Sequence, residues 1–292
     1  PVEYERVDHD GKSLGYITVH TFGSETLSKL QNALDTLEAE GIDGLIIDLR
    51  DNGGGYLTTV NGMLDIFLVE GELPMFTIEQ LQNGSWVSRD YDASGSERKP
   101  YDILTMVNGY SASASEVFSA GMKEKGGYDV LGMPTYGKGT MQSAISLEPH
   151  NEDELHLSQG RWLTPEGNWV DPTDGDIEHV SPTIQVEQNP YFSGFNVLVD
   201  DDPLVYDTVS DQVENAQRIL NIMGYDVRED GYFDEATRSA VSDLQAEEGL
   251  SVTGEIGEET GTILSDHLYT YRTNNENDHQ YQAALDYFSA ND

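Results

Sequence analysis

The sequence contains no cysteine among its 292 residues, so disulfides, thiolate metal sites and thiol catalysis are excluded. It also contains no apolar run of about 18 residues, the length that a membrane-spanning helix needs. It opens with Pro1 and without a signal peptide, so we expect a processed or trimmed start. The lack of cysteine leaves the compartment open, because many exported bacterial proteins also have none.

Basic residues are scarce. Fifteen Lys and Arg stand against 54 Asp and Glu, which gives a formal net charge of -39 spread over the whole length. Such a chain would be repelled by phosphate backbones and anionic lipid, so nucleic acid is not an expected partner. An evenly acidic, lysine-poor surface favours adaptation to high salt, where screening weakens self-repulsion. The 37% hydrophobic content is enough for a proper core, and we expect a globular protein.

Residues 1–190 alternate short apolar runs with helical periodicity, which predicts one α/β domain with a mixed sheet and flanking helices. A polar tip at residues 81–86 predicts a hairpin. The expected strands are 14–22, 44–50, 103–109 and 128–132, and the expected helices are 25–40, 60–69 and 113–124.

A stretch rich in Pro, Gly and Asp follows, and we place a linker at residues 191–205. Beyond it, apolar residues at a 3.6-residue period predict a small all-α domain at 206–268. This domain contains an internal repeat: 230–241 and 253–264 match in their Gly, apolar, Glu and Thr positions. Each copy predicts a glycine turn, an apolar anchor (Phe233 or Ile256) and a helix with an acidic first turn.

The last segment, 269–292, is a polar tail to which we assign no function. It can form one short amphipathic helix around 278–288, which places Tyr281, Leu285 and Phe288 on a common side.

Three serines alternate in "NGYSASASEVFSAG", at Ser111, Ser113 and Ser115, just before an expected helix. Ser113 and Glu116 have the spacing of a capping box, which needs no chemistry. A serine at a strand-to-helix turn also exposes its hydroxyl, and helix-start amides beside it can bind an oxyanion. A nucleophile at this position still needs a base.

The seven histidines lie in no recognisable triad context, so lysine is the other candidate for the base. The sequence has only six lysines, and Lys138 lies between glycines in "TYGKGTMQ". To act as a base it must lose about 3 pKa units, which costs roughly 4 kcal/mol and requires an apolar, closed cleft. If 138–146 form a strand, Lys138, Thr140 and Gln142 share a face, and Gln142 could hold the amine. A solvated turn lysine is the simpler alternative.

Two glycine-rich turns offer other readings. Gly132, Gly137 and Lys138 match the start of a phosphate loop, but Gly139 replaces the magnesium-binding Ser or Thr and a strand pattern follows. The turn "DLRDNGGG" follows a buried strand without a lysine, so it is either a tight turn or an anion site of backbone amides.

Together, "GLIIDLRDNGGG", "VNGYSASASEVFSAG" and "PTYGKGTMQ", in this order and spacing, resemble the carboxyl-terminal processing (tail-specific) serine peptidases over residues 1–190. The resemblance implies a ClpP/crotonase-like peptidase core that needs no metal or cofactor. It also implies catalytic residues: Ser113 as nucleophile, Lys138 as general base and Gln142 as its orienting partner. Ser111 and Ser115 then become packing or capping residues.

The oxyanion hole implied by the resemblance joins the Ala114 amide to the amide of Gly54 or Gly55, and the sequence leaves that choice open. The implied reaction is hydrolysis of proteins or peptides through an acyl-enzyme. The family normally has a PDZ domain upstream, which we expect to be missing from this chain. A homodimer is possible. "HVSPTIQV" has Pro182 and Thr183 where the family usually has Pro-Asp, which we expect to leave the chemistry unchanged.

Residues 206–268 resemble a peptidoglycan-binding three-helix module, carried by the Asp-Gly-x-Phe, Ala-Val, Leu-Gln and Thr-Gly pattern. A helical packing domain without a ligand is the alternative. With a peptidase, such a module implies an extracytoplasmic protein that is secreted, wall-bound or anchored through a missing N-terminal segment. We therefore expect a serine endopeptidase that acts near protein C-termini; a non-catalytic peptide- or wall-binding scaffold is the competing hypothesis.

Overall fold

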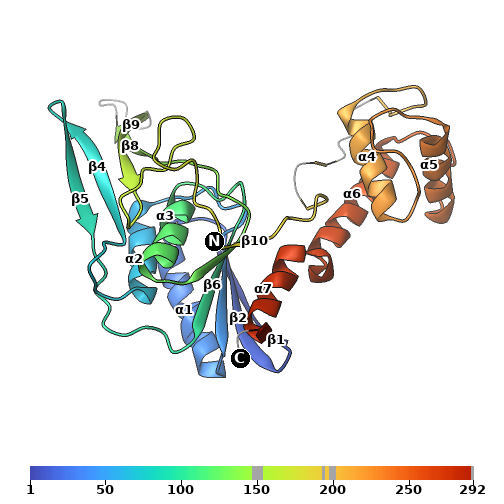
Figure 1. Cartoon of the computed structure of the whole chain (residues 1–292). Coiled ribbons are helices and arrows are strands. Elements are labelled where there is room, and N and C mark those ends of the chain that lie inside the picture. The colour runs from blue at the N-terminus through green and yellow to red at the C-terminus, as the bar shows by residue number, and fades with distance from the viewer. Residues whose placement is uncertain (147–153, 193–194, 197–201, 291–292) are drawn as a thin grey trace. The chain divides into compact units, whose positions relative to one another are not determined.

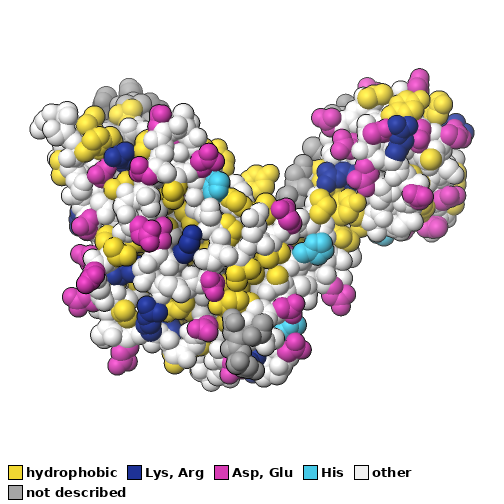
Figure 2. All heavy atoms as spheres, in the orientation of Figure 1, with side chains coloured by type: hydrophobic (Ala, Val, Ile, Leu, Met, Phe, Trp, Pro, Cys, Tyr) yellow, Lys and Arg dark blue, Asp and Glu magenta, His cyan; other side chains and the backbone are white. Residues whose placement is uncertain are grey.

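A computed structural model describes residues 1–146, 154–192, 195–196 and 202–290. The chain divides into two compact units, Pro1–Gln188 with Gln280–Asp292, and Asn189–His279. Figure 1 shows both units, and each is described by itself. Acidic side chains are scattered over the visible face of the molecule, where Lys and Arg are few (Figure 2). No helix in the described ranges is both long and apolar enough to cross a membrane.

The first unit is built on a six-stranded sheet with the order β1-β2-β3-β6-β7-β10. β1 is antiparallel to β2, and all other neighbours are parallel. The mixed sheet predicted from the sequence is therefore confirmed. The strands are β1 (Val2–His9), β2 (Lys12–Val19), β3 (Gly44–Asp48), β6 (Asp102–Val107), β7 (Asp129–Gly132) and β10 (Ile184–Gln185).

Both faces of this sheet are covered, which explains why every residue of β3 is buried. On β2, β3 and β6, odd-numbered side chains such as Ile17 and Ile47 belong to the core cluster that contains the helices α1, α2 and α3. Even-numbered ones such as Leu14 and Ile46 pack with residues of α7. These helices are α1 (Thr26–Glu40), α2 (Leu57–Phe67), α3 (Ala114–Ala120), which continues into the π-helical turn η1 (Gly121–Lys125), and α7 (His279–Ala290).

Helix α7 comes from the polar tail and belongs to the first unit. Its buried side is formed by Tyr281, Ala284, Leu285 and Phe288, so the amphipathic helix predicted there is confirmed. The sequence did not reveal what this side packs against. It packs against one face of the six-stranded sheet, whose first strands lie more than 200 residues earlier in the chain.

A second, antiparallel sheet of the first unit has the order β5-β4-β9-β8. Asn83 and Gly84 both have positive φ at the predicted hairpin tip, as a two-residue turn of this kind requires. The strands are β4 (Phe76–Gln82), β5 (Ser85–Tyr91), β8 (Thr140–Ser146) and β9 (Glu154–Leu163).

The second unit contains three main helices, α4 (Asp211–Ile222), α5 (Glu235–Glu247) and α6 (Glu258–Thr273), and the short turn η2 (Asn275–Asn277). Ser210 and Asp234 cap α4 and α5 by accepting backbone N–H groups. Part of the predicted linker also packs here, because Tyr191 and Phe195 join the core of this unit.

The internal repeat of the second unit is visible in its hydrogen bonds. Gln217 accepts the N–H groups of Asp230 and Gly231 and donates to the Thr237 hydroxyl at 3.0 Å. Gln245 accepts those of Thr253 and Gly254 and donates to the Thr260 hydroxyl, also at 3.0 Å. Each buried glutamine thus holds one copy of the glycine turn, and the anchors Phe233 and Ile256 are fully buried.

Candidate active site

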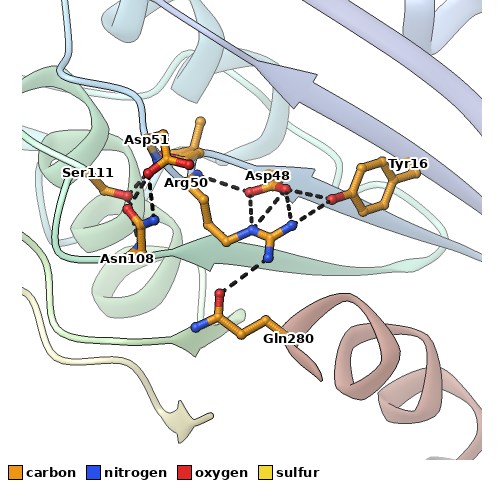
Figure 3. A network of polar contacts seen from close by, with 8 residues as sticks. Tyr16, Asp48, Arg50, Asp51, Asn108, Ser111 and Gln280 are labelled. Carbon is orange, nitrogen blue, oxygen red and sulfur yellow. Dashed lines mark hydrogen bonds and ion pairs between the residues drawn. The ribbon is translucent and has the colours of Figure 1, made fainter. Parts of the chain in front are cut away.

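Two turns meet at the carboxyl ends of the neighbouring parallel strands β3 and β6. The Asn108 side chain accepts the Asp51 N–H at 3.0 Å and donates to the Asp51 carboxylate at 2.9 Å. The Ser111 hydroxyl donates to the Leu49 carbonyl at 2.8 Å. The glycine-rich turn and the serine-rich turn therefore form one locked unit (Figure 3).

Asn52 organises the glycine turn from within. It is fully buried, its amide donates to the Val19 carbonyl at 2.6 Å, and its side-chain oxygen accepts the Gly54 N–H at 2.9 Å. Its backbone carbonyl accepts the Ser115 hydroxyl at 2.8 Å. Ser111 and Ser115 are thus both buried packing residues, which agrees with the role that the resemblance implies for them.

Gly54 has φ +103°, and a Cβ atom there would lie 2.9 Å from Cβ of Ser113 and 3.0 Å from the Ala114 nitrogen. A side chain at this position would therefore push the turn away from Ser113.

An ion-paired network lies beside these turns (Figure 3). Arg50 binds the Asp48 carboxylate through Nε and Nη2, at 2.9 and 2.7 Å, and the Tyr16 hydroxyl donates to the same carboxylate. Arg50 also donates to Gln280 of α7, whose amide donates to the Val186 carbonyl. The sequence analysis missed Asp48, Arg50 and Asn52; the signal was a run of polar residues directly after a buried apolar strand.

Ser113 lies where the chain turns from β6 into α3, with a positive φ of 57°. This region is unfavourable for a residue other than glycine, so the turn is held by its surroundings. Its backbone N–H donates to the Glu116 carboxylate at 2.8 Å. The capping role predicted for Glu116 is therefore confirmed, but it is only part of what this carboxylate does.

Glu116 is fully buried and accepts four hydrogen bonds. One oxygen accepts the Thr135 hydroxyl at 2.6 Å and the Gly137 N–H at 2.7 Å. The other accepts the N–H groups of Ser113 and Lys138, both at 2.8 Å. A single carboxylate therefore holds the backbone of the two predicted catalytic residues, which lie 25 positions apart in the chain.

A cavity of about 500 Å³ brings the predicted residues together. Ser113, Ala114, Lys138, Gln142 and Gly55 all line it, together with apolar side chains of α2, α3 and the small sheet. Gly54 is not among the lining residues. No histidine of the described part of the chain lines this cavity either.

The lysine of this cavity is fixed at its backbone, while its amine makes no hydrogen bond or ion pair with the described residues. The Trp162 indole donates to the Lys138 carbonyl at 3.0 Å. A Cβ atom on Gly137 would lie 2.4 Å from the Glu178 carbonyl oxygen, and one on Gly139 would lie 1.7 Å from the Val170 carbonyl oxygen. The two flanking glycines therefore serve close backbone packing.

Gln142 lies on β8, which begins at Thr140. The pairing of β8 with β9 shifts between Met141 and Gln142. Both Met141 and Gln142 line the cavity at this change of register, where Gln159 is the extra residue on β9. The phosphate-loop alternative is wrong, since a strand follows Lys138 where that motif requires a helix.

The comparisons with known proteins agree with this geometry. The family model described as peptidase family S41 matches residues 13–186. The chain belongs to peptidase family S41. This confirms the family and the fold that the sequence motifs predicted.

Two relatives of this chain are carboxy-terminal processing proteases of Bacillus subtilis (strain 168). CtpB is 35% identical over 276 residues, which cover 94% of this chain and 55% of CtpB. CtpA is 29% identical over 286 residues, which cover 98% of this chain and 58% of CtpA. The chain thus spans somewhat more than half the length of these curated relatives.

A solved structure of the photosystem II D1 C-terminal processing protease also matches, with a TM-score of 0.50 and 26% identity over 64% of this chain and 48% of that one. Outside the S41 region, residues 209–264 match a putative peptidoglycan binding domain. That match lies on the three helices of the second unit.

Proposed function

We propose that this S41 chain is a serine endopeptidase with Ser113 as nucleophile and Lys138 as general base. The observation that carries the proposal is the Glu116 carboxylate, which binds the backbone N–H of both residues at 2.8 Å beside a shared cavity. An arrangement that binds peptides without cleaving them has no need to tie these two backbones together.

In the proposed reaction the neutral amine of Lys138 accepts the Ser113 proton while the serine oxygen attacks the peptide carbonyl. The protonated amine then gives its proton to the leaving amine, and water resolves the acyl-enzyme in the same way. Lys138 lines the cavity together with the apolar side chains of Leu57 and Val117. Gln142, which also lines the cavity, is the proposed orienting partner of the amine.

The tetrahedral oxyanion needs two donors. The Ala114 N–H is the first amide of α3 and has no partner within the helix. For the glycine donor we favour Gly55, which lines the cavity, because the Gly54 N–H already donates to Asn52.

The relatives are named as proteases that process carboxyl termini. By likeness to them, the proposed substrates are proteins cut near their C-termini. The putative peptidoglycan binding domain supports an extracytoplasmic, wall-associated location, which remains a proposal. A non-catalytic scaffold that binds peptide or cell wall is the competing function.

Proteolysis of an unfolded protein such as β-casein tests the proposal. Ser113→Ala and Lys138→Ala should each lower the rate by at least about a thousandfold, since members of a catalytic unit fail together. Ser28 and Lys29 lie on the exposed side of α1. The matched control variants Ser28→Ala and Lys29→Ala should therefore keep wild-type activity. An active Lys138→Ala variant would show that the base is another group, and an inactive wild type would favour the scaffold.

The location can be tested separately. The full chain should sediment with purified cell-wall sacculi, and a chain that lacks residues 206–268 should not. Equal sedimentation of both chains would refute wall binding by the second unit.

A further inference from the structure

Two tryptophans enclose an arginine on the small antiparallel sheet. The Arg161 guanidinium carbon lies 4.8 Å from the ring centroid of Trp86 and 4.9 Å from that of Trp169. Arg161 also binds the Glu79 carboxylate at 2.7 Å. The charge of this arginine is therefore neutralised inside the stack, and Trp86 remains 51% exposed.

The stack lies on the opposite side of the sheet from the wall of the catalytic cavity. Ile78 and Trp162, which line the cavity, are cross-strand partners and so share a face. Arg161 is adjacent to Trp162 along β9 and therefore points to the other face. Thr140, the partner of Arg161 on the edge strand β8, points the same way. We call this side the outer face.

A groove of about 720 Å³ lies over the outer face. Its apolar part consists of Leu81, Trp86 and Trp169, and its uncharged polar lining residues are Gln80, Gln82, Thr140, Ser158 and Gln159. Thr140 lines both this groove and the catalytic cavity. The two hollows therefore meet at the edge strand that follows Lys138.

The groove differs from the rest of the molecule in charge. The chain has a net charge of -39, yet among the described residues the groove has a single charged lining residue, Arg161, which is paired with Glu79. The hydroxyl of Thr140, which points to this face, can both donate and accept hydrogen bonds, as a peptide backbone requires. Flat indole rings bind apolar side chains with little loss of conformational freedom.

We propose that the outer-face groove binds a segment of the peptide substrate beyond the cleavage site, through an uncharged aromatic or aliphatic side chain. The inference rests on the proposed peptidase function and adds a second point of contact to it. The substrate crosses the edge strand at Thr140, and Trp86 is the main contact. Trp86 acts on substrate affinity and takes no part in the chemistry.

Kinetics with two peptides tests the groove. A bond cut in β-casein, with Phe or Leu on both flanks, supplies a short peptide around the bond and a longer one with its natural flanks. The wild type should show a lower KM for the longer peptide. Trp86→Ala should raise that KM roughly tenfold, the usual scale for loss of an aromatic contact, and leave kcat and the short peptide unchanged.

Val87→Ala is the matched control. Val87 is 46% exposed and follows Trp86 on β5, so it points to the opposite face. It should behave as wild type with both peptides. An unchanged KM for the longer peptide in Trp86→Ala, or an equal loss of kcat with both peptides, would overturn the proposal.

A binding measurement separates this proposal from the catalytic one. Fluorescently labelled β-casein should bind the full-length Ser113→Ala chain, and adding Trp86→Ala should weaken that binding roughly tenfold. This result is independent of whether the wild type cleaves anything. Displacement of β-casein by an N-acetylglucosamine tetramer, lost on Trp86→Ala, would instead make the groove a glycan site and refute the proposal.

Discussion

The Oε2 atom of Glu116 accepts the backbone N–H of Lys138 at 2.8 Å. The same atom accepts the N–H of Ser113 at the same distance. Because the carboxylate is fully buried, each of these bonds is protected from competition by water. The relative position of the proposed nucleophile and base thus depends on a third residue, Glu116.

Glu116→Gln should lower both activity and stability. The glutamine amide keeps the shape of the carboxylate, but its NH₂ group cannot accept hydrogen bonds. The donors that one carboxylate oxygen binds would therefore lose their acceptor. Leaving such donors unsatisfied costs about 1–3 kcal/mol of unfolding free energy, and we expect kcat to fall by at least about tenfold. Urea unfolding and β-casein cleavage measure the two effects. Glu124→Gln is the control. The Glu124 carboxylate in η1 accepts one backbone N–H, that of Glu166, so this change should alter neither the unfolding free energy nor kcat. Wild-type kcat in Glu116→Gln would contradict the positioning role.

Helix α7 should be coupled energetically to the central sheet at Gly44. A Cβ atom on Gly44 would lie 2.4 Å from the Phe288 ring, so Gly44→Ala must displace that ring. Gly44→Ala should cost about 1–3 kcal/mol, and Phe288→Ala about 3–5 kcal/mol. In the double variant the clash is absent, so its loss should be smaller than the sum of the two single losses. Strict additivity in urea unfolding would show that Phe288 is not packed against β3.

The two halves of the second unit should respond separately to loss of their glutamines. Gln245→Ala leaves the N–H groups of Thr253 and Gly254 without their acceptor, at a cost of about 1–3 kcal/mol. Hydrogen exchange should accelerate in the 253–257 turn and much less in the 230–234 turn, and Gln217→Ala should show the reverse. Ser239→Ala, on the exposed side of α5, should change neither turn. Equal acceleration of both turns by either variant would disprove the independence of the repeats.

Alkaline pH should weaken the contact between α7 and β7. Burial and a hydrogen bond to Asp129 raise the pKa of Tyr287 to about 12. The unfolded chain has a tyrosine pKa near 10, so above that pH it binds fewer protons than the folded state. The contribution of Tyr287 is therefore complete below pH 10 and is lost as the pH rises towards 12. Urea unfolding at pH 9 and 11 should show a smaller loss for Tyr287→Phe than for wild type; equal losses would contradict this assignment.

Added salt should stabilise the fold. At a net charge of -39 the folded chain repels itself, and the screening length falls from about 10 Å at 0.1 M salt to about 3 Å at 1 M. The thermal midpoint should therefore rise between 0.1 and about 1 M KCl. Equimolar sucrose, which does not screen charge, serves as the control. A midpoint that rises no more in KCl than in sucrose would argue against adaptation to high salt.

The elements of the first unit could be predicted from local sequence because their apolar periodicity is local. The run "GLIIDLR" and the turn "LQNGSW" specify a buried strand and a hairpin tip through their own residues. The motifs around Ser113 and Lys138 likewise pointed to residues that line one cavity. Asp48, Arg50 and Asn52 were missed because their partners are Tyr16, Gln280 and Val19, which no local pattern connects to them.

By itself, the sequence determined the fold class, the candidate nucleophile and base, the repeat of the second unit and the amphipathic side of the last helix. Tertiary structure alone decided what that helix covers and how Ser113 comes to lie near Lys138. Both depend on burial that is completed by distant segments: α7 closes the second face of the parallel sheet, and the Glu116 carboxylate collects amides from two separate turns. In sequence, a glutamate that only caps a helix looks the same as one that also binds a second turn. The difference lies in the partners, here the N–H groups of Gly137 and Lys138, that folding brings within 3 Å of the Glu116 carboxylate.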